Sequence, residues 1–414
     1  MLLKSVIMKN RYLCLVFLSV FVSCSAQKTK FVESNLNFAE LQTQGMLKVA
    51  KDVTRYPRAT NNDGSLKLTN MFDWTSGFFA GNLWLLYEFT QNETWKQNAI
   101  HWTESLEPLK NFKEHHDLGF MMYCSYGNAY RLTHNLGYKA ILIQSAESLS
   151  SRYSPITGCI KSWNYRKSWN GKSEWFFPVI IDNMMNLELL FFASKETGDP
   201  KYRDIAIKHA ETTLKNHFRK DFSTYHVVNY DTITGAVRNQ ATMQGYADAS
   251  TWARGQAWAI YGFTMVYRET KNPKFLKAAI AAADFYLNNK NLPKDMIPYW
   301  DFDVKNTNFI PDWKYNGQYL LTSRDASAAA ITSSALFELS LYAGNKGGNY
   351  RNAAKTMLYN LSRNYLGGLG NNNNFILKHS VGSFPHNEEI DVPLVYADYY
   401  FLEALMRYKN LTGN

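Results

Sequence analysis

The sequence predicts an all-α protein in which paired helices close into a toroid within a single domain. Apolar residues recur at helical spacing through most of the chain, and long alternating strand patterns are scarce. The phrase ETGDP at residues 196–200 returns as ETKNP at residues 269–273, and each copy precedes an amphipathic stretch. Such an echo is typical of a repeated helical hairpin. No Gly/Ser-rich linker divides the chain, because the asparagine run at residues 371–374 is too short to separate two domains.

The helices expected along the chain follow from this periodicity and from local stop signals. A dense apolar stretch covers residues 74–89, and the two echoed phrases contain Gly, Asn and Pro, which end one helix and start the next. Residues 224–237 lack a helical pattern and are expected to form a loop or a hairpin. The remaining expected helices are residues 182–195, 252–267, 274–287, 326–342 and 391–408.

Composition and charge limit the classes of function. The 414 residues are 46% hydrophobic, which excludes a disordered chain, and 15% aromatic, with 11 Trp, 27 Tyr and 25 Phe. Aromatic faces suit either a thick helical core or a carbohydrate cleft. The net charge of +10 favours a polyanionic partner, but no run of basic residues and no nucleic-acid motif is present. We therefore expect no nucleic-acid partner, which leaves an acidic polysaccharide as the expected polyanionic partner.

The N-terminus is interpreted as an export signal covering residues 1–26, followed by one domain at residues 27–414. Lys4, Lys9 and Arg11 precede an apolar run, residues 12–22, that is too short to span a bilayer. Loss of these three positive charges leaves the mature chain at +7. The next residues, FVSC at 21–24, resemble a lipobox with Cys24 as the lipidated residue, although cleavage after Ala26 without a lipid and a buried N-terminal helix are alternatives. We expect export to the periplasm or attachment to the outer membrane through that lipid.

Only Cys124 and Cys159 remain after the signal, and nothing in the sequence pairs them. Neither lies in a spacing typical of zinc ligands, so no metal site is predicted.

Two acidic residues lie in segments that suit catalysis. Asp182 follows the apolar residues 176–181, and Asp117 follows two histidines and precedes Leu-Gly. Glycoside chemistry needs two carboxyl groups in different protonation states, and apolar flanks raise the pKa of one of them. The simpler interpretation is that each aspartate caps a helix or begins a turn.

A third segment, residues 244–258, would suit a sugar carboxylate. On a helix Arg254 and Trp258 share one face, where a guanidinium fork lies beside an aromatic plane. An internal salt bridge of Arg254 is the alternative, and His226 is equally compatible with an inert loop histidine. The sequence contains no G-x-S-x-G motif and no P-loop.

Taken together, these segments resemble the unsaturated glucuronyl hydrolases, family 88 of the glycoside hydrolases. The resemblance runs from about residue 70 to the end and keeps the family's order of five phrases. These are DWTSGFFAGNLW at 73–84, HDLGF at 116–120, IDNMMNL at 181–187, TWARGQAW at 251–258 and GSFPHNEEIDVPLVYADYYFLEAL at 382–405. The resemblance implies an (α/α)6 barrel, in agreement with the helical pattern.

The resemblance also implies roles for individual residues. The general acid/base falls on Asp182 and the second essential aspartate on Asp117. Trp163 is a weaker match, because Trp169 and Trp175 compete for its place. No lysine follows Ser383 in the C-terminal loop that senses sulfate in the family, so sulfate tolerance is in doubt there. The substrate-binding residues implied are Trp74, Phe78, Trp163, His226, Gln244, Arg254, Trp258 and Ser383.

The implied reaction removes a 4,5-unsaturated uronic acid from the non-reducing end of small acidic oligosaccharides, by hydration of the C4=C5 bond and without a cofactor. An unsaturated rhamnogalacturonyl hydrolase is the nearest alternative. A glycan-binding lipoprotein without activity would explain the aromatics but not the two acids. A polysaccharide lyase on the same toroid would need a Tyr/His pair, for which Tyr225-His226 is the only match.

Overall fold

The computed structural model describes residues 30–412. The predicted signal segment, with Cys24 as its lipidated residue, lies outside these residues. None of the described helices is both long enough and apolar enough to cross a membrane.

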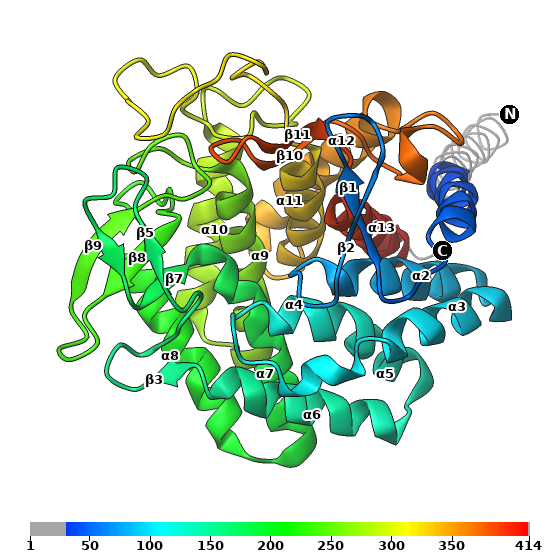
Figure 1. Ribbon diagram of the computed structural model, residues 1–414, viewed down its shortest axis with the longest axis horizontal. Coiled ribbons are helices and arrows are strands. Elements are labelled where there is room, and N and C mark those ends of the chain that lie inside the picture. The colour runs from blue at the N-terminus through cyan, green and yellow to red at the C-terminus, as the bar shows by residue number, and fades with distance from the viewer. Residues whose placement is uncertain (1–29, 413–414) are drawn as a thin grey trace, which may run out of the picture.

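The helices form two concentric layers (Figure 1). Each element of the inner layer packs on the next, and the last packs back on the first, so the ring is closed. The predicted all-α (α/α)6 barrel is therefore confirmed. The inner elements are α2 (Ser76–Thr90), the composite α4 (Leu118–Met122), η2 (Tyr123–Gly127) and α5 (Asn128–Thr133), then α7 (Leu187–Thr197), α9 (Ala253–Thr270), α11 (Ala326–Leu339) and α13 (Val395–Thr412).

The outer helices pack one face against the inner ring and expose the other face to solvent. In α8 the buried residues fall at helical spacing on one side, whereas all residues of the inner helix α11 are buried. The outer layer consists of the helix at residues 30–49, α3 (Glu93–Glu104), α6 (Leu136–Ser150), α8 (Pro200–Asn216), α10 (Pro273–Asn288) and α12 (Gly347–Asn364).

The echoed phrases form the same turn twice, as the repeat predicts. Gly198 and Lys271 each adopt a left-handed conformation that ends an inner helix. Asp199 and Asn272 then cap the next helix by accepting a hydrogen bond from a backbone N–H. A proline follows as the first helical residue in both copies, where its missing N–H costs nothing.

Two predicted helix starts are wrong. Residues 391–394 do not begin the last helix, because β11 (Glu388–Val392) pairs with β10 (Ser380–Ser383) and the residue before Pro393 is restricted to extended conformations. Residues 182–186 belong to the 3-10 helix η3 (Ile181–Asn186), and α7 begins only at Leu187. The helix expected to reach residue 342 ends at Leu339 in a turn.

Short antiparallel sheets gather at the end of the barrel where the inner helices begin, because each one precedes an inner helix in the chain. The hairpin expected at residues 224–237 is confirmed, although its strands reach residue 241. The pairs are β1 (Tyr56–Thr60) with β2 (Leu66–Thr69), β3 (Tyr153–Ser154) with β4 (Cys159–Ile160), β5 (Arg166–Lys167) with β6 (Glu174–Trp175), β10 with β11, and β7 (Pro178–Ile180) with β8 (Val227–Tyr230) and β9 (Val237–Ala241).

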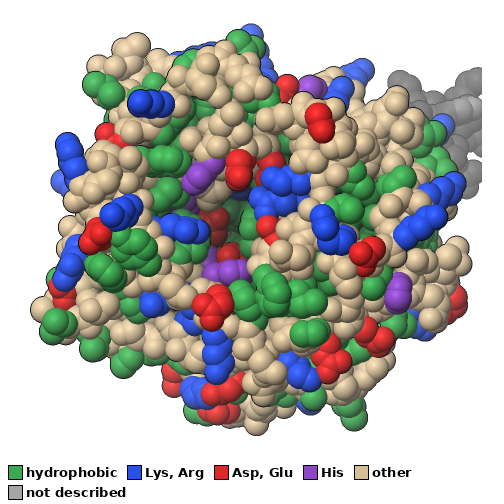
Figure 2. Space-filling model, in the orientation of Figure 1, with side chains coloured by type: hydrophobic (Ala, Val, Ile, Leu, Met, Phe, Trp, Pro, Cys, Tyr) green, Lys and Arg blue, Asp and Glu red, His purple; other side chains and the backbone are tan. Residues whose placement is uncertain are grey.

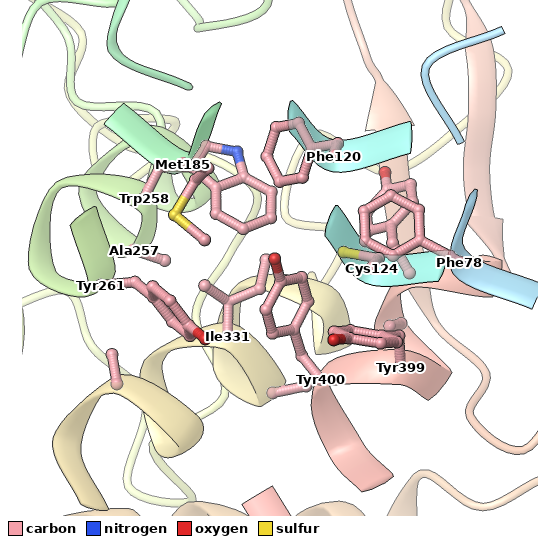
Figure 3. Packing of buried hydrophobic residues seen from close by; sticks show 14 of the residues in the cluster. Phe78, Phe120, Cys124, Met185, Ala257, Trp258, Tyr261, Ile331, Tyr399 and Tyr400 are labelled. Atoms are coloured by element: carbon pink, nitrogen blue, oxygen red, sulfur yellow. The ribbon is translucent and has the colours of Figure 1, made fainter. Parts of the chain in front are cut away.

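Aromatic side chains fill the middle of the ring, so the barrel is a packed core and not a pore. Figure 3 shows rings from α2, α4, α9 and α13 meeting there. Phe120 contacts Trp258 with ring centroids 5.2 Å apart, and Trp258 contacts Tyr400 at 5.4 Å. Cys124 and Cys159 are both buried and both free.

Candidate active site

Close packing of two segments brings the two candidate aspartates to the same place. A Cβ atom added to Gly119 would lie 2.4 Å from Cα of Asn186, so only glycine allows α4 to approach η3 this closely. The Phe120 backbone N–H also donates to Asn186 Oδ1 at 2.9 Å. Asp117, at the start of α4, and Asp182, in η3, consequently lie close enough for their charges to interact.

Neither aspartate acts as a helix cap. Asp182 lies within η3, and Asp117 stands at the N-cap position of α4 without accepting a capping hydrogen bond from its side chain. The helix-cap interpretation is therefore wrong for both side chains, although Asp117 does lie in a turn, and their carboxyl groups are available for other contacts.

Asp182 keeps its proton up to about neutral pH. Its side chain is only 12% exposed, and its Oδ2 has no hydrogen-bond partner among the described residues. Burial raises the pKa of Asp182 to about 7, with the charge of Asp117 adding to the rise and that of Arg254 opposing it. A carboxyl group with such a pKa can serve as a general acid and, after giving up its proton, as a general base.

Asp117 is held in its ionised form. Its two carboxylate oxygens lie 3.2 Å from His115 Nδ1 and 3.4 Å from His116 Nε2. Burial opposes its ionisation, but the neighbouring His116, His115 and Arg152 outweigh burial and lower the pKa of Asp117. Two adjacent carboxyl groups with pKa values pushed apart are the arrangement that separates an acid from a stabilising anion.

His226 faces Asp182 as a neutral donor. Its Nδ1 accepts hydrogen bonds from the backbone N–H groups of Met243 (3.0 Å) and Gln244 (3.2 Å), so the ring proton resides on Nε2. Burial lowers the pKa of His226 well below its usual value, which keeps the ring uncharged. Nε2 lies 3.8 Å from Asp182 Oδ2 and has no hydrogen-bond partner among the described residues. This N–H is therefore free to donate to a bound hydroxyl group.

Arg254 forms the internal salt bridge that was the alternative to a ligand contact. The guanidinium, in the first turn of α9, is 1% exposed and lies 3.0 Å from Asp325 Oδ2. It also donates to the backbone carbonyls of Val381 and Gly382 in β10. Arg254 thus fixes the strand that borders the site, and its positive charge still acts on Asp182.

A cavity of about 130 Å³ opens beside this cluster, lined among others by Trp74, Gln244, Arg254 and Ser383. Gln244 donates from Nε2 to the Gly382 carbonyl at 3.3 Å, and Ser383 Oγ lies 2.6 Å from His386 Nδ1. In Figure 2 the molecule is hollowed near the centre of this face, with acidic and histidine side chains inside the hollow and Lys and Arg side chains around it.

Comparisons with known proteins agree with this geometry. The sequence model of Glycosyl Hydrolase Family 88 matches residues 46–288. The chain belongs to this family. An unsaturated glucuronyl hydrolase of Formosa agariphila is 46% identical over 96% of both chains. An unsaturated chondroitin disaccharide hydrolase of Streptococcus pneumoniae is 31% identical over 85% of this chain and 86% of its own.

Solved structures extend the comparison to three dimensions. The crystal structure of an unsaturated glucuronyl hydrolase specific for heparin superimposes with a TM-score of 0.85 at 44% identity, covering 92% of this chain and 98% of that one. The structure of the enzyme from Bacillus sp. GL1 gives a TM-score of 0.80 at 30% identity, covering 91% of this chain and 96% of that one. The predictions of a glycoside hydrolase, and of the unsaturated glucuronyl type within family 88, are confirmed.

The aromatic residues predicted for sugar binding in this family 88 chain occupy different depths. Trp74 borders the cavity, whereas Phe78 and Trp258 are fully buried beneath the site. The Trp163 ring lies 6.1 Å from His226, which places it beside the candidate acid. Of its two competitors, Trp169 contacts His386 at 4.7 Å, and Trp175 belongs to the core.

Several residues at the family 88 site were missed by the sequence analysis. Arg58 in β1 lines the cavity and pairs with both Asp73 and Glu389, although it lies in no recognised phrase. His386 and Tyr396 also line the cavity and lie within the quoted C-terminal phrase, so that phrase was the available signal. Among residues 30–412, no group of three His, Cys, Asp or Glu side chains is arranged to hold a metal ion.

Proposed function

We propose that Asp182 carries out the hydration of a 4,5-unsaturated uronic acid at the non-reducing end of a lyase-made oligosaccharide. The observation that carries this proposal is the pairing of a protonated, buried Asp182 with an ionised Asp117. An ordinary glycosidase places its acid against the glycosidic oxygen. A conjugated enol ether instead needs a proton on carbon, which a carboxyl group with a pKa of about 7 supplies at neutral pH.

Asp182 alone can carry both proton transfers of the hydration reaction. Its proton passes to C4, and positive charge develops on C5 and the ring oxygen. The Asp182 carboxylate then takes a proton from water, whose oxygen bonds to C5. The resulting hemiketal opens the ring, and the hemiacetal left at C1 releases the rest of the saccharide.

Asp117 and His226 would position the sugar around this acid. Ionised Asp117 accepts hydrogen bonds from ring hydroxyl groups, and its charge stabilises the positive charge that develops at C5. The Nε2–H of His226 donates to a hydroxyl group without carrying charge. Trp74 offers an aromatic face at the cavity, with Trp163 on the side of His226.

The substrate carboxylate is favoured by the field of the site as a whole. The helices α2, α9, α11 and α13 all begin at this end of the barrel, and each N-terminus carries about half a positive charge. Arg254 adds positive charge beside the cavity, which its salt bridge with Asp325 partly compensates. Because its guanidinium already holds Asp325 and β10, we infer that Arg254 acts mainly through its field and that Gln244 makes the direct contact.

The relatives differ in the polysaccharide from which their substrates come: one acts on a chondroitin disaccharide, and another is specific for heparin. At the C-terminal loop Ser383 bonds to His386 with no lysine beside it, which favours an unsulfated sugar there. We also propose that the chain is exported, on the strength of its N-terminal charged and apolar segments.

The test is a panel of lyase-made unsaturated disaccharides, sulfated and unsulfated, followed by the ultraviolet absorbance of the conjugated double bond. The native chain should abolish this absorbance, Asp182→Asn should not, and Asp204→Asn on the exposed face of α8 should behave as the native chain does. Activity that persists in Asp182→Asn would assign the acid to another residue. Inactivity on every glucuronyl disaccharide would favour the rhamnogalacturonyl alternative.

A further inference from the structure

Asp117 has two ion-pair partners among the described residues, and only one of them can carry a charge near neutral pH. His116 is fully buried, and burial lowers its pKa to about 4. Its Nδ1 lies 3.3 Å from the amide nitrogen of Asn186, which can only donate, so the His116 ring is neutral with its proton on Nε2. Burial also lowers the pKa of His115, but Asp117 outweighs burial and raises it. Compensation of the Asp117 charge therefore depends on His115.

The contacts of the His115 ring determine which nitrogen gains and loses the proton. Nε2 lies 3.0 Å from the backbone carbonyl of Phe72, which can only accept, so Nε2 keeps its proton in both charge states. The titrating nitrogen is therefore Nδ1, which lies 3.2 Å from Asp117 Oδ2. In the charged ring Nδ1–H donates to this carboxylate. In the neutral ring the Nδ1 lone pair accepts from the Asp117 backbone N–H at 3.3 Å and faces the carboxylate without a proton between them.

The other side of the ring contacts the loop that joins β2 to α2. Phe72 lies in this loop, two residues before Trp74, which borders the cavity. The ring of Phe112 contacts His115 at 4.6 Å and Phe72 at 5.7 Å, so the imidazole is held by packing as well as by its hydrogen bonds. The helix α4 that follows Asp117 packs against α2 (Figure 1). His115 thus joins the carboxylate on one segment to the aromatic face on the other.

The remaining charged groups near His115 do not form an ion pair with it. These groups are Arg152, Asp73, Lys113 and Glu114. Arg152 donates to backbone carbonyls through both terminal nitrogens, and its positive charge opposes protonation of His115. Asp73 pairs with Arg58, and the last two groups are exposed to solvent. The charge state of His115 is consequently set mainly by the balance between burial and Asp117.

We propose that His115 is a positioning residue that binds Asp117 through Nδ1–H and the loop of Trp74 through Nε2–H, and that its charge offsets the effect of Asp117 on Asp182. This inference rests on the proposed function and adds a dependence on pH to it. The charged ring compensates Asp117, whereas the neutral ring leaves the full negative charge to act on Asp182. Loss of the His115 proton as the pH rises therefore strengthens the hold of Asp182 on its own proton and extends the reaction to higher pH.

Two variants separate the two contacts, because the amide nitrogen of glutamine can occupy the place of Nε2 and that of asparagine the place of Nδ1. Both variants remove the positive charge, so the alkaline limb of kcat should rise by about half a pH unit in each. His115→Gln keeps the hydrogen bond to Phe72, and its KM should stay within about twofold of the native value. His115→Asn loses that hydrogen bond, and its KM should rise about threefold to tenfold because the loop of Trp74 is released.

His101→Gln, on the exposed face of α3, is the matched control and should change neither the limb nor KM. A side chain that only fills space would lower activity without moving the limb to higher pH. An alkaline limb that stays in place in both variants, or a KM that rises equally in both, would overturn the proposal.

NMR of the ring nitrogens in isotope-labelled histidine tests the same proposal without activity. The signals of His115 are those that His115→Gln lacks. They should show a proton on Nε2 at high pH and titration at Nδ1, with a midpoint that falls by about one unit in Asp117→Asn. A proton that resides on Nδ1 at high pH, or a midpoint that does not move, would overturn the proposal. Failure of the native chain to act on any unsaturated disaccharide would instead refute the proposed function, and the NMR result would still decide the role of His115.

Discussion

Replacing Asp182 by asparagine should inactivate the protein and also make it more stable, by an amount that grows as the pH rises from about 4 to about 7. Burial raises the pKa of Asp182 from 3.8 to about 7. Each pKa unit corresponds to about 1.36 kcal/mol, so keeping this carboxyl group buried costs about 4 kcal/mol above pH 7. Asparagine cannot ionise and avoids that cost.

The direction in which stability changes with pH follows from the number of protons bound by the folded and the unfolded chain. Below pH 4 the carboxyl group is protonated in both the folded and the unfolded chain, so the native protein and Asp182→Asn should be similarly stable. Between pH 4 and pH 7 the folded chain retains a proton that the unfolded chain has lost, and the native protein loses stability relative to the variant. The contribution of protonated Asp182 is therefore present at low pH and is lost as pH rises through about 7.

The assay is urea-induced unfolding of the native chain and Asp182→Asn at pH 4.5, 6 and 8, with Asp204→Asn as the control for a surface aspartate. The difference in free energy of unfolding should grow from about 1 kcal/mol at the lowest pH to about 4 kcal/mol at the highest. A difference that does not change with pH, or a variant less stable than the native chain at pH 8, would refute the assignment of a buried, protonated carboxyl group.

Three further predictions concern the neighbours of this acid. Asp117→Asn removes a negative charge that raises the pKa of Asp182, so the alkaline limb of residual kcat/KM should move to lower pH; an unmoved limb would show that the two groups do not interact. Arg254→Ala leaves Asp325 buried without its cation and should cost about 3–5 kcal/mol in chemical denaturation, whereas a loss under 1 kcal/mol would contradict the buried pair. Gly119→Ala places a Cβ against Asn186 and should cost about 1–3 kcal/mol and lower kcat/KM by shifting Asp117; the control Gly348→Ala in α12 has open space and should be neutral or slightly stabilising.

The barrel could be predicted from the sequence because its inner helices are apolar on nearly all sides, whereas its outer helices are apolar on one side only. The turn that joins α7 to α8 and α9 to α10 was visible as a repeated phrase with caps and prolines. The start of α13 could not be predicted in the same way. The apolar periodicity continues into residues 391–394, but pairing of β10 with β11 takes these residues out of the helix.

Of three predicted site residues that lie close together in the structure, Asp117 and Asp182 belong to distinctive phrases of the sequence, whereas His226 does not. Asp117, Asp182 and His226 come from different segments, and the structure places them together. Arg58 could not be found, because its pairing with Glu389 joins positions far apart in the chain. The salt bridge of Arg254 with Asp325 and the full burial of Phe78 likewise depend on packing that no local pattern reveals.

The central claim, protonation of C4 by Asp182 and addition of water at C5, is tested most directly by running the reaction in deuterium oxide and examining the released sugar by NMR. The account predicts one deuterium at C4, loss of the double bond, and oxygen from labelled water on C5. A released sugar that keeps its double bond, with no deuterium at C4 and the water oxygen on C1, would show ordinary glycosidic hydrolysis and contradict the account.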